Sequence, residues 1–332
     1  MDDARETLII INHTAARARA AWSVVRGELE RHNLRFDAHE ARGPGDAQAT
    51  ARAALRAGCP VIAVVGGDGT LSEVAAGFFE DDDGEGAMRA NFSKPINPRA
   101  ALAVLPAGTG NDFARALQHE RASLSHWLTR LLAHLRGNAD SPTRSIDVLH
   151  GRQAPGGQPA RRSFICLNAA TLGIGAEVAG RVAAQTNTLR RLPGETRFAL
   201  AALAALLRWR SRRMRITVDD ESFECGTNLI AVVNSAYAGG GMMFSPAAKV
   251  DDGLLDVVTA CDLSRAAVLR EMTRIHRGGH LANPRVSVRR GVRVLIESLT
   301  SADTLPVEAD GDVRGPTPVE FRVMPGALRV VM

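Results

Sequence analysis

The 332 residues carry a formal net charge of +5, and 45% of them are hydrophobic, which is ample for folding. A chain of this length predicts two domains rather than a single core. Its longest helical apolar run, Phe198–Leu207, is far shorter than the roughly 20 residues of a transmembrane helix, so a membrane span is excluded.

Arginine supplies nearly all of the positive charge, because Lys94 and Lys249 are the only lysines. Arginine is the better bidentate partner of phosphate, although genomic base composition would explain the bias equally well. The cysteines show no metal-ligand spacing and lie mostly in apolar runs: Cys59, Cys166, Cys225 and Cys261. We expect reduced, buried thiols. Together with an N-terminus that has no secretory signal, they predict a cytoplasmic protein.

The first part of the chain alternates strands and helices. The expected strands are Leu8–Ile11, Arg35–Glu40, Val61–Val65 and Ala101–Leu105. The expected helices are Ala15–Arg31, Asp46–Ala57, Leu71–Phe79 and a stretch from Asn111 to about Arg136. This alternation predicts an α/β domain over residues 1–137, with a parallel sheet covered on both faces. The acidic insert Glu80–Arg99 is expected to be a solvated loop.

From residue 138 to residue 332 the pattern changes to strands separated by turns, with few helices. The expected strands are Ile146–His150, Ser163–Ala169, Arg215–Val218, Asn228–Asn234, Leu254–Thr259, Val286–Arg289, Val292–Glu297 and Val319–Val323. They predict a mainly β, sandwich-like C-terminal domain, whose last strand could pack back on the first domain. An exposed edge strand of such a sandwich would allow a homodimer.

The segment Val61–Val74 carries the strongest motif of the chain. Its apolar residues predict a buried strand, and a helix opens near Thr70. The turn between them contains Gly66, Gly67 and Gly69. Such glycines let the backbone approach a bulky anion, and the helix N-terminus presents free N–H groups. Asp68 lies inside this anion cradle, where its charge makes sense if it handles a metal, a hydroxyl proton or a sugar hydroxyl.

A second segment, Leu105–Arg115, repeats the order of strand, Gly-rich turn, polar pair and helix. Together the two segments resemble the diacylglycerol-kinase catalytic domain family, ATP-dependent lipid kinases that include bacterial diacylglycerol kinases and sphingosine kinases. The family patterns GGDGTxxEV and PxGTxNDFAR are both intact. The likeness continues through Gly239–Val257 and Glu308–Asp312, so it spans nearly the whole chain.

The resemblance implies that ATP binds at the two Gly-rich turns, whereas the alternative is a pair of ordinary tight turns. The implied nucleotide-binding residues are Asn12, Gly66, Gly67, Asp68, Gly69, Thr70, Leu71, Ser72 and Thr109. The chain departs from the family pattern at His13, Ala16, Ala18 and Ala41. Alanine in place of glycine restricts the backbone, while Arg17 and Arg19 could supply charge to the phosphates.

Asp251–Leu254 has the density of oxygen ligands that Mg²⁺ prefers. By resemblance, Asp252 is the side-chain ligand, and Lys249 and Leu254 contribute carbonyl oxygens. The alternative is a turn between strands with solvated aspartates.

Asp310-Gly311-Asp312 matches a family motif whose final carboxylate is taken as the proton acceptor. Here that residue is Asp312, one methylene shorter than the family's glutamate. Asp68 competes for the role of base, and we keep both as catalytic candidates. The alternative for the Asp-Gly pair is a β-hairpin turn.

An apolar stretch, Glu195–Leu207, runs into arginines that flank Trp209. The arginines are Arg208, Arg210, Arg212 and Arg213. This arrangement suits docking on anionic lipid headgroups. A core helix with a basic C-terminal end explains it equally well.

The combined prediction is an ATP- and Mg²⁺-dependent kinase of a lipid hydroxyl, peripheral on the inner face of the membrane and not a nucleic-acid-binding protein. Diacylglycerol giving phosphatidic acid is the best single expectation for the reaction. An NAD kinase-like activity is the alternative, because that related group shares the Gly-Gly-Asp-Gly-Thr turn. A catalytically weak relative that binds lipid or nucleotide without turnover is a third.

Overall fold

The computed structural model describes residues 7–80, 93–118, 123–137, 142–153, 163–183, 200, 204–206 and 208–332. The chain forms two compact units. Unit 1 contains Met1–Val148, Val250–Gly253 and Met324–Met332, and unit 2 contains Leu149–Lys249 and Leu254–Val323. The N-terminal segment, most of the insert Glu80–Arg99 and most of the run Phe198–Leu207 lie outside the described residues.

Unit 1 is built on a parallel sheet in the order β2-β1-β3-β4. Its strands are β1 (Thr7–Ile11), β2 (Phe36–Glu40), β3 (Val61–Gly66) and β4 (Ala101–Pro106). Every residue of β1, β3 and β4 is buried, as expected for central strands with helices on both faces. The expected α/β fold of the N-terminal part is confirmed.

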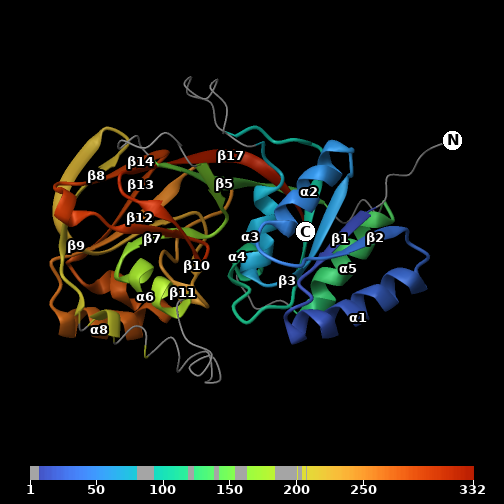
Figure 1. The fold of residues 1–332 in the computed structure, drawn as a ribbon, viewed down its shortest axis with the longest axis horizontal. Helices are drawn as coiled ribbons and strands as arrows, with labels where there is room; N and C mark the ends of the chain where they lie inside the picture. The colour runs from blue at the N-terminus through green and yellow to red at the C-terminus, as the bar shows by residue number, and fades with distance from the viewer. Residues whose placement is uncertain are drawn as a thin grey trace. The chain divides into compact units, whose positions relative to one another are not determined.

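The helices of unit 1 are α1 (Ala16–Arg31), α2 (Asp46–Arg56), α3 (Asp68–Ala76), α4 (Asp112–Gln118) and α5 (Leu124–Leu135). The chain steps from β1 to β2 in one direction and from β2 to β3 in the other, so right-handed crossovers place α1 and α2 on opposite faces. Accordingly α1 packs with α5, and α2 packs with α3 (Figure 1).

Unit 2 is a mainly antiparallel, sandwich-like β structure, which confirms the expected class of the C-terminal part. Its strands include β6 (Ser163–Cys166), β7 (Ala169–Gly173), β8 (Arg212–Val218), β9 (Glu221–Val233), β10 (Tyr237–Ala238), β11 (Met242–Met243), β12 (Leu255–Cys261), β13 (Val286–Gly291), β14 (Arg293–Ser298), β15 (Pro306–Ala309) and β16 (Asp312–Pro316). Alternate residues of β8 enter the core, namely Met214, Ile216 and Val218.

Two long strands contribute residues to both units: β5 (Thr143–Gln153) and β17 (Val319–Val331). In unit 2, β17 pairs with β14. In unit 1 its end pairs in parallel with β4, with Arg329 opposite Ala101. The last strand therefore adds to the sheet of the first unit.

Two details of unit 2 differ from the sequence expectation. The expected strand Ser163–Ala169 is interrupted, because the amides of Leu167 and Asn168 donate to the Asp310 carboxylate at 2.7 and 3.0 Å. The unit also has the helices α6 (Ile174–Ala183) and α8 (Arg265–Arg274). Helix α8 escaped prediction because its buried face includes Glu271 beside Val268, which blurs the apolar period.

The cysteine expectation is wrong for one pair. Cys225 on β9 and Cys261 at the end of β12 form a disulfide, with their Cα atoms 5.9 Å apart. The two strands are antiparallel neighbours with a register shift at Cys261, and this pairing brings distant cysteines within bonding range. Cys59 and Cys166 are free and buried, as expected. Cysteine usage therefore no longer argues for a reducing compartment.

Candidate nucleotide and catalytic site

The two Gly-rich turns of unit 1 touch through their backbones. A Cβ added at Gly108 would lie 2.5 Å from the Cα of Gly67 and 2.9 Å from Oδ1 of Asn111. Only glycine permits this approach. Asn111 adopts a positive φ of 51° and closes its own turn by accepting a hydrogen bond from the Gly108 amide at 2.9 Å. The expectation that two such turns lie side by side is met within one unit.

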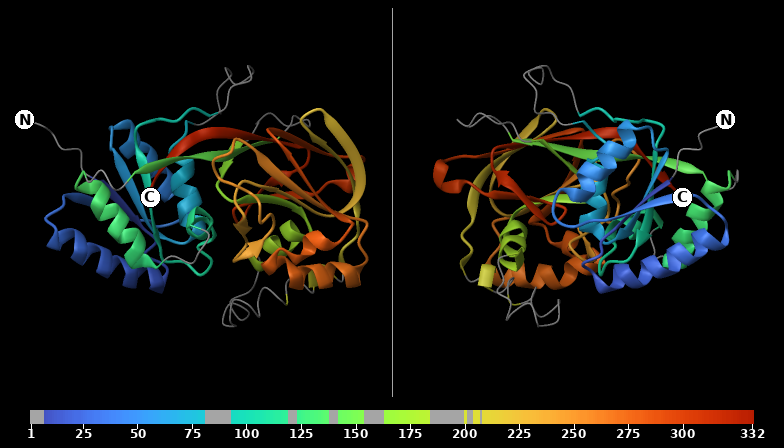
Figure 2. Two further views of the ribbon diagram at one scale, coloured as in Figure 1. Left: turned by 180° about the vertical axis from the view of Figure 1, so that it is seen from behind. Right: turned by 45° about the vertical axis from the view of Figure 1, so that its right-hand side comes forward.

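The turns lie at the carboxyl ends of β3 and β4. Strand β1 is central, with β2 on one side and β3 on the other, so the strand order reverses between β1 and β3. In open α/β sheets the crevice beyond such a reversal is the usual ligand site. Figure 2 lets the reader follow β1, β3 and β4 from two further sides.

Helix α3 begins three residues earlier than expected, at Asp68, after Gly67. Its first turn has no side-chain cap, and the first amides of a helix have no partner within it, so those of Gly69 and Thr70 can meet an anion. The Leu71 amide is an exception, because it donates to the Gly67 carbonyl at 3.0 Å. Thr70, Leu71 and Ser72 are buried, whereas Gly69 is exposed and a Cβ there would meet no protein atom within 4 Å.

Asp68 connects the two turns. Its Oδ1 accepts a hydrogen bond from the Phe113 amide at 3.1 Å, in the first turn of α4. The carboxylate thus lies at the N-terminal ends of two helices, α3 and α4, where the dipoles favour negative charge. A negative charge is unexpected in a site for an anion. The two helix dipoles explain why Asp68 is tolerated there, and no metal is needed to explain it.

Asn12 lies where β1 ends and donates from Nδ2 to Thr70 Oγ1 at 3.0 Å. Helix α1 starts directly afterwards, so Ala16 and Ala18 are helical residues, and Ala18 is fully buried. Alanines thus stand in the first turn of α1 at the positions of the family's glycines. Arg17 reaches the second turn, with NH1 3.5 Å from Thr109 Oγ1, while Arg19 donates to the His13 carbonyl at 2.8 Å.

Beside this edge lies a cavity of about 760 Å³ that the sequence did not reveal. It runs along the edge strand β2 and helix α1, and His13, Glu40 and Ala41 line its end near the carboxyl ends of β1 and β2. His13 Nδ1 lies 3.3 Å from Glu40 Oε1 across it. Ala41 offers no hydrogen-bonding side chain here, so the polar groups at this end of the cavity include His13 and Glu40.

The loop that contains the expected metal ligands is fixed by a buried carboxylate that sequence reasoning missed. Asp147 on β5 accepts hydrogen bonds from the amides of Gly253 at 2.6 Å and Gly326 at 2.8 Å. Burial raises the pKa of Asp147. The first aspartate of the loop, Asp251, forms an ion pair with Arg144 at 2.6 Å. Asp252 is the remaining carboxylate of the loop and is half-buried.

Within the described residues, no group of three or more His, Cys, Asp or Glu side chains is placed to hold a metal. The expected magnesium site is not such a cluster of side chains, since it combines the Asp252 carboxylate with the carbonyl oxygens of Lys249 and Leu254. Such a set of hard oxygen donors fits Mg²⁺, which keeps several waters.

In unit 2, Asp310 and Gly311 form the turn of the β15–β16 hairpin, with φ values of 47° and 97°. The Asp-Gly pair therefore does form a β-hairpin turn, and this geometry leaves the proposed role of Asp312 open. Asp312 opens β16, its side chain is 74% exposed, and Arg314 NH2 lies 3.2 Å from Oδ2.

Glu308 lies beneath this turn and is a residue to which sequence reasoning assigned no role. Its carboxylate accepts hydrogen bonds from Thr171 Oγ1 and from the Gly311 amide, both at 2.5 Å. Burial raises its pKa to about 7, although these hydrogen bonds favour the ionised form. A carboxyl group that titrates near neutrality therefore supports the turn that carries Asp312.

The arginine segment divides into two environments. Trp209 is buried in the core with Ala205 and Leu206, so the core alternative is correct for these apolar residues. Arg208 and Arg210 are exposed. Within the described residues, no helix is long and apolar enough to cross a membrane.

Comparison with known proteins agrees with this geometry. Residues 6–148 match the diacylglycerol kinase catalytic domain, and residues 171–332 match the YegS C-terminal NAD kinase beta sandwich-like domain. A Pseudomonas aeruginosa protein named "Probable lipid kinase YegS-like" is 32% identical over 86% of this chain and 81% of its own length. A Mycobacterium tuberculosis diacylglycerol kinase is 30% identical over 89% of this chain and 82% of its own length.

Three solved Bacillus anthracis structures, whose titles name a diacylglycerol kinase, cover 98–100% of this chain and 96–97% of their own. Their TM-scores are 0.70, 0.68 and 0.60 at 18–20% identity. Yeast NADH kinase has a TM-score of 0.56 at 11% identity, over 99% of this chain and 84% of that one. At these identities the structures show the fold alone.

The fold and the paired turns thus define an α/β unit that is joined to a separate β-rich unit. The chain belongs to the diacylglycerol kinase catalytic-domain family of lipid kinases.

The buried Glu308 predicts a specific pH dependence of stability. Between pH 4.5 and about 7 the folded protein keeps a proton that the unfolded chain has lost, so stability falls as pH rises. A shift of this size corresponds to about 3 kcal/mol. Urea unfolding at about pH 4.5 and about pH 8 should show this loss in the wild type and not in Glu308→Gln. Parallel pH profiles for the two proteins would contradict the assignment.

Proposed function

We propose that the protein transfers the γ-phosphoryl group of ATP to a lipid hydroxyl, with Mg²⁺, and that diacylglycerol is the acceptor. The observation that carries the proposal is the contact of the two Gly-rich turns at Gly67 and Gly108, which opens the first turn of α3 toward the carboxyl edge of the sheet. Family membership supplies the reaction class, and the acceptor is inferred from relatives named as diacylglycerol kinases.

In this proposal the phosphates lie over exposed Gly69, against the amides of Gly69 and Thr70 in the first turn of α3. Thr109 and Arg17 approach from the second turn and from α1. Asn12 orders the edge through Thr70. The nucleoside would then occupy the cavity beside His13 and Glu40.

The Asp252 carboxylate and the carbonyls of Lys249 and Leu254 would hold Mg²⁺, which neutralises phosphate charge when bound. Asp147 keeps the loop in shape through the Gly253 amide. The proton of the acceptor hydroxyl goes to Asp312 by the family motif. Asp68 would orient phosphate, metal or hydroxyl. If the Asp312 variants show that Asp312 is not the base, Asp68 takes that role.

The labelling of lipids tests the reaction itself. Incubation with γ-labelled ATP, Mg²⁺ and a total lipid extract should place label in phosphatidic acid, and omission of Mg²⁺ should abolish it. A parallel reaction with NAD tests the alternative that the NADH kinase fold likeness raises. Label in NADP, or no label in any lipid while ATP still binds, would overturn the proposal in favour of the second or third expectation.

A matched pair of glycine variants tests the nucleotide position. Gly69→Ala adds a methyl group that meets no protein atom, so stability should stay unchanged. If phosphate lies over this residue, KM for ATP should rise about tenfold or more, since overpacking a close contact costs about 1–3 kcal/mol. Gly108→Ala, whose Cβ meets the Gly67 backbone, should lower the melting temperature as well. An unchanged KM in Gly69→Ala would remove the phosphate from this turn.

Substitutions of the two carboxylates separate their roles. Asp68→Asn keeps an oxygen that can accept from the Phe113 amide, so folding should persist while turnover falls by at least ~10². Asp312→Asn should reduce the rate similarly, and Asp312→Glu should retain or raise it. Full activity in Asp312→Asn together with loss in Asp312→Glu would leave Asp68 as the base.

A further inference from the structure

Helix α8 of unit 2 presents an outward face that combines positive charge with an exposed apolar side chain. At 3.6 residues per turn, one side of the helix carries Arg265, Ala266, Leu269, Arg270 and Thr273, all of them exposed. Leu269 is 51% exposed, one of few large apolar side chains so exposed in the described part of the chain. The opposite side packs inward through Val268, Glu271 and Ile275.

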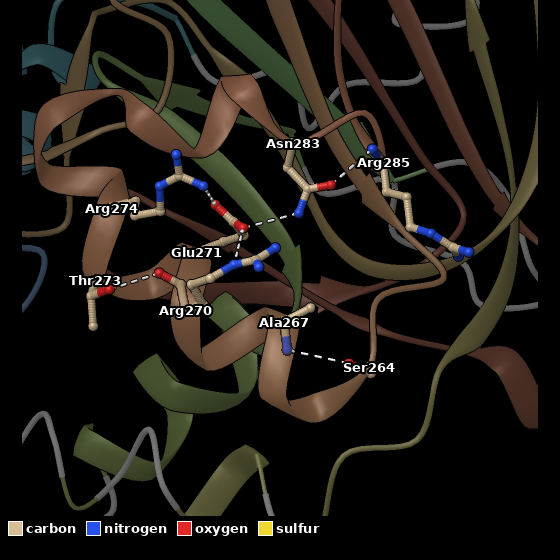
Figure 3. Close-up of polar contacts among 8 residues, drawn as sticks. All are labelled: Ser264, Ala267, Arg270, Glu271, Thr273, Arg274, Asn283 and Arg285. Carbon is tan, nitrogen blue, oxygen red and sulfur yellow. Dashed lines mark hydrogen bonds and ion pairs between the residues drawn. The ribbon is translucent and has the colours of Figure 1, made fainter.

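Glu271 is the single acidic residue between Arg265 and Arg277, and it lies beneath the outward face rather than on it. Glu271 is buried, and its carboxylate accepts from the Asn283 side chain at 3.0 Å (Figure 3). Arg270 Nε and Arg274 NH1 approach it from the helix at 3.0 and 3.4 Å. Since the side chain of Arg270 is still 62% exposed, its guanidinium spans the buried carboxylate and the surface.

A second segment adds charge at the N-terminal end of α8. Arg265 NH2 lies 3.4 Å from the carbonyl oxygen of Trp209. Trp209 is buried, and its two neighbours, Arg208 and Arg210, are exposed. The exposed arginines of this segment therefore adjoin those of α8.

The arginines of β8 differ, although the sequence groups them with Arg208 and Arg210. Arg213 and Arg215 both lie against Glu224 of β9, with Arg215 NH2 2.7 Å from its Oε1. Asp303 accepts from the Arg213 amide at 3.0 Å. Glu224 offsets part of this charge, as Glu271 does on α8. The α8 side stays the more positive one because the exposed Arg208, Arg210 and Arg265 add to it.

We propose that the outward face of α8, together with Arg208 and Arg210, docks unit 2 on a bilayer that contains anionic lipids. Arginines would pair with phosphate headgroups while Leu269 enters the boundary between headgroups and acyl chains. This deepens the proposed function, on which it rests for the need to meet a lipid substrate. It replaces the sequence expectation that Arg212 and Arg213 share in docking.

A matched pair of triple variants tests the surface. Arg277 is exposed in the short 3-10 turn Ile275–Arg277 that follows α8. Arg208→Gln, Arg210→Gln and Arg277→Gln remove charge from the α8 side, and Arg212→Gln, Arg213→Gln and Arg215→Gln remove as much from β8. The first triple should weaken binding to phosphatidylglycerol-containing vesicles roughly 10²-fold at low salt, as three surface arginines imply. The second should change it little. Equal losses in both triples, or none in the first, would overturn the proposal.

Leu269→Gln tests the apolar part without changing charge. The loss of vesicle binding should be larger at high salt than at low salt, because charge is then screened and the apolar contact matters more. The melting temperature should stay unchanged because the Leu269 side chain is exposed. Activity of every variant on lipid dispersed in detergent should match the wild type. Wild-type protein that binds vesicles but labels no lipid in detergent would refute the proposed function alone. Labelling in detergent without vesicle binding would refute the docking surface alone.

Discussion

The contact between Gly67 and Gly108 is the constraint on which the candidate site depends. Two parallel strands end side by side, and their turns can meet only because neither residue has a Cβ. The contact leaves α3 and α4 with their N-termini at one edge, so two dipoles and several amides converge there. Asp68 then joins the turns through the Phe113 amide. An anion cradle results from backbone geometry before any charged side chain contributes.

Carboxylates that accept backbone amides organise the loops in both units. Asp147 holds the amides of Gly253 and Gly326, as Asp310 holds those of Leu167 and Asn168. A carboxylate that accepts several amides replaces the hydration those amides would lose, so a loop can be buried in one shape. The motif Asp310-Gly311-Asp312 thus contains an aspartate that shapes the backbone, Asp310, beside the proposed base, Asp312.

The comparisons and the geometry answer different questions. Family models that match residues 6–148 and 171–332 define the reaction class, and neither they nor the fold identifies the lipid. The geometry adds features that the family motifs do not contain: the start of α1 at Ala16, a cavity that reaches Ala41, and a basic face on α8. Each alters how the protein would meet its nucleotide or its membrane, and the shared motifs show none of them.

The sequence by itself determined the order of elements in unit 1 and the position of both Gly-rich turns, because apolar period, glycine and proline act locally. It missed Asp147, since an isolated carboxylate has no local pattern and gains its role from amides far along the chain. It placed Glu308 in a family motif but gave it no role, because its burial and its contact with Thr171 come from the pairing of distant strands. Cys225 and Cys261 met for the same reason, through strand pairing over 36 residues. Neighbouring strands and helices likewise decided whether an arginine lies against a carboxylate or faces solvent. Only the tertiary structure therefore distinguished the arginines of α8 from those of β8.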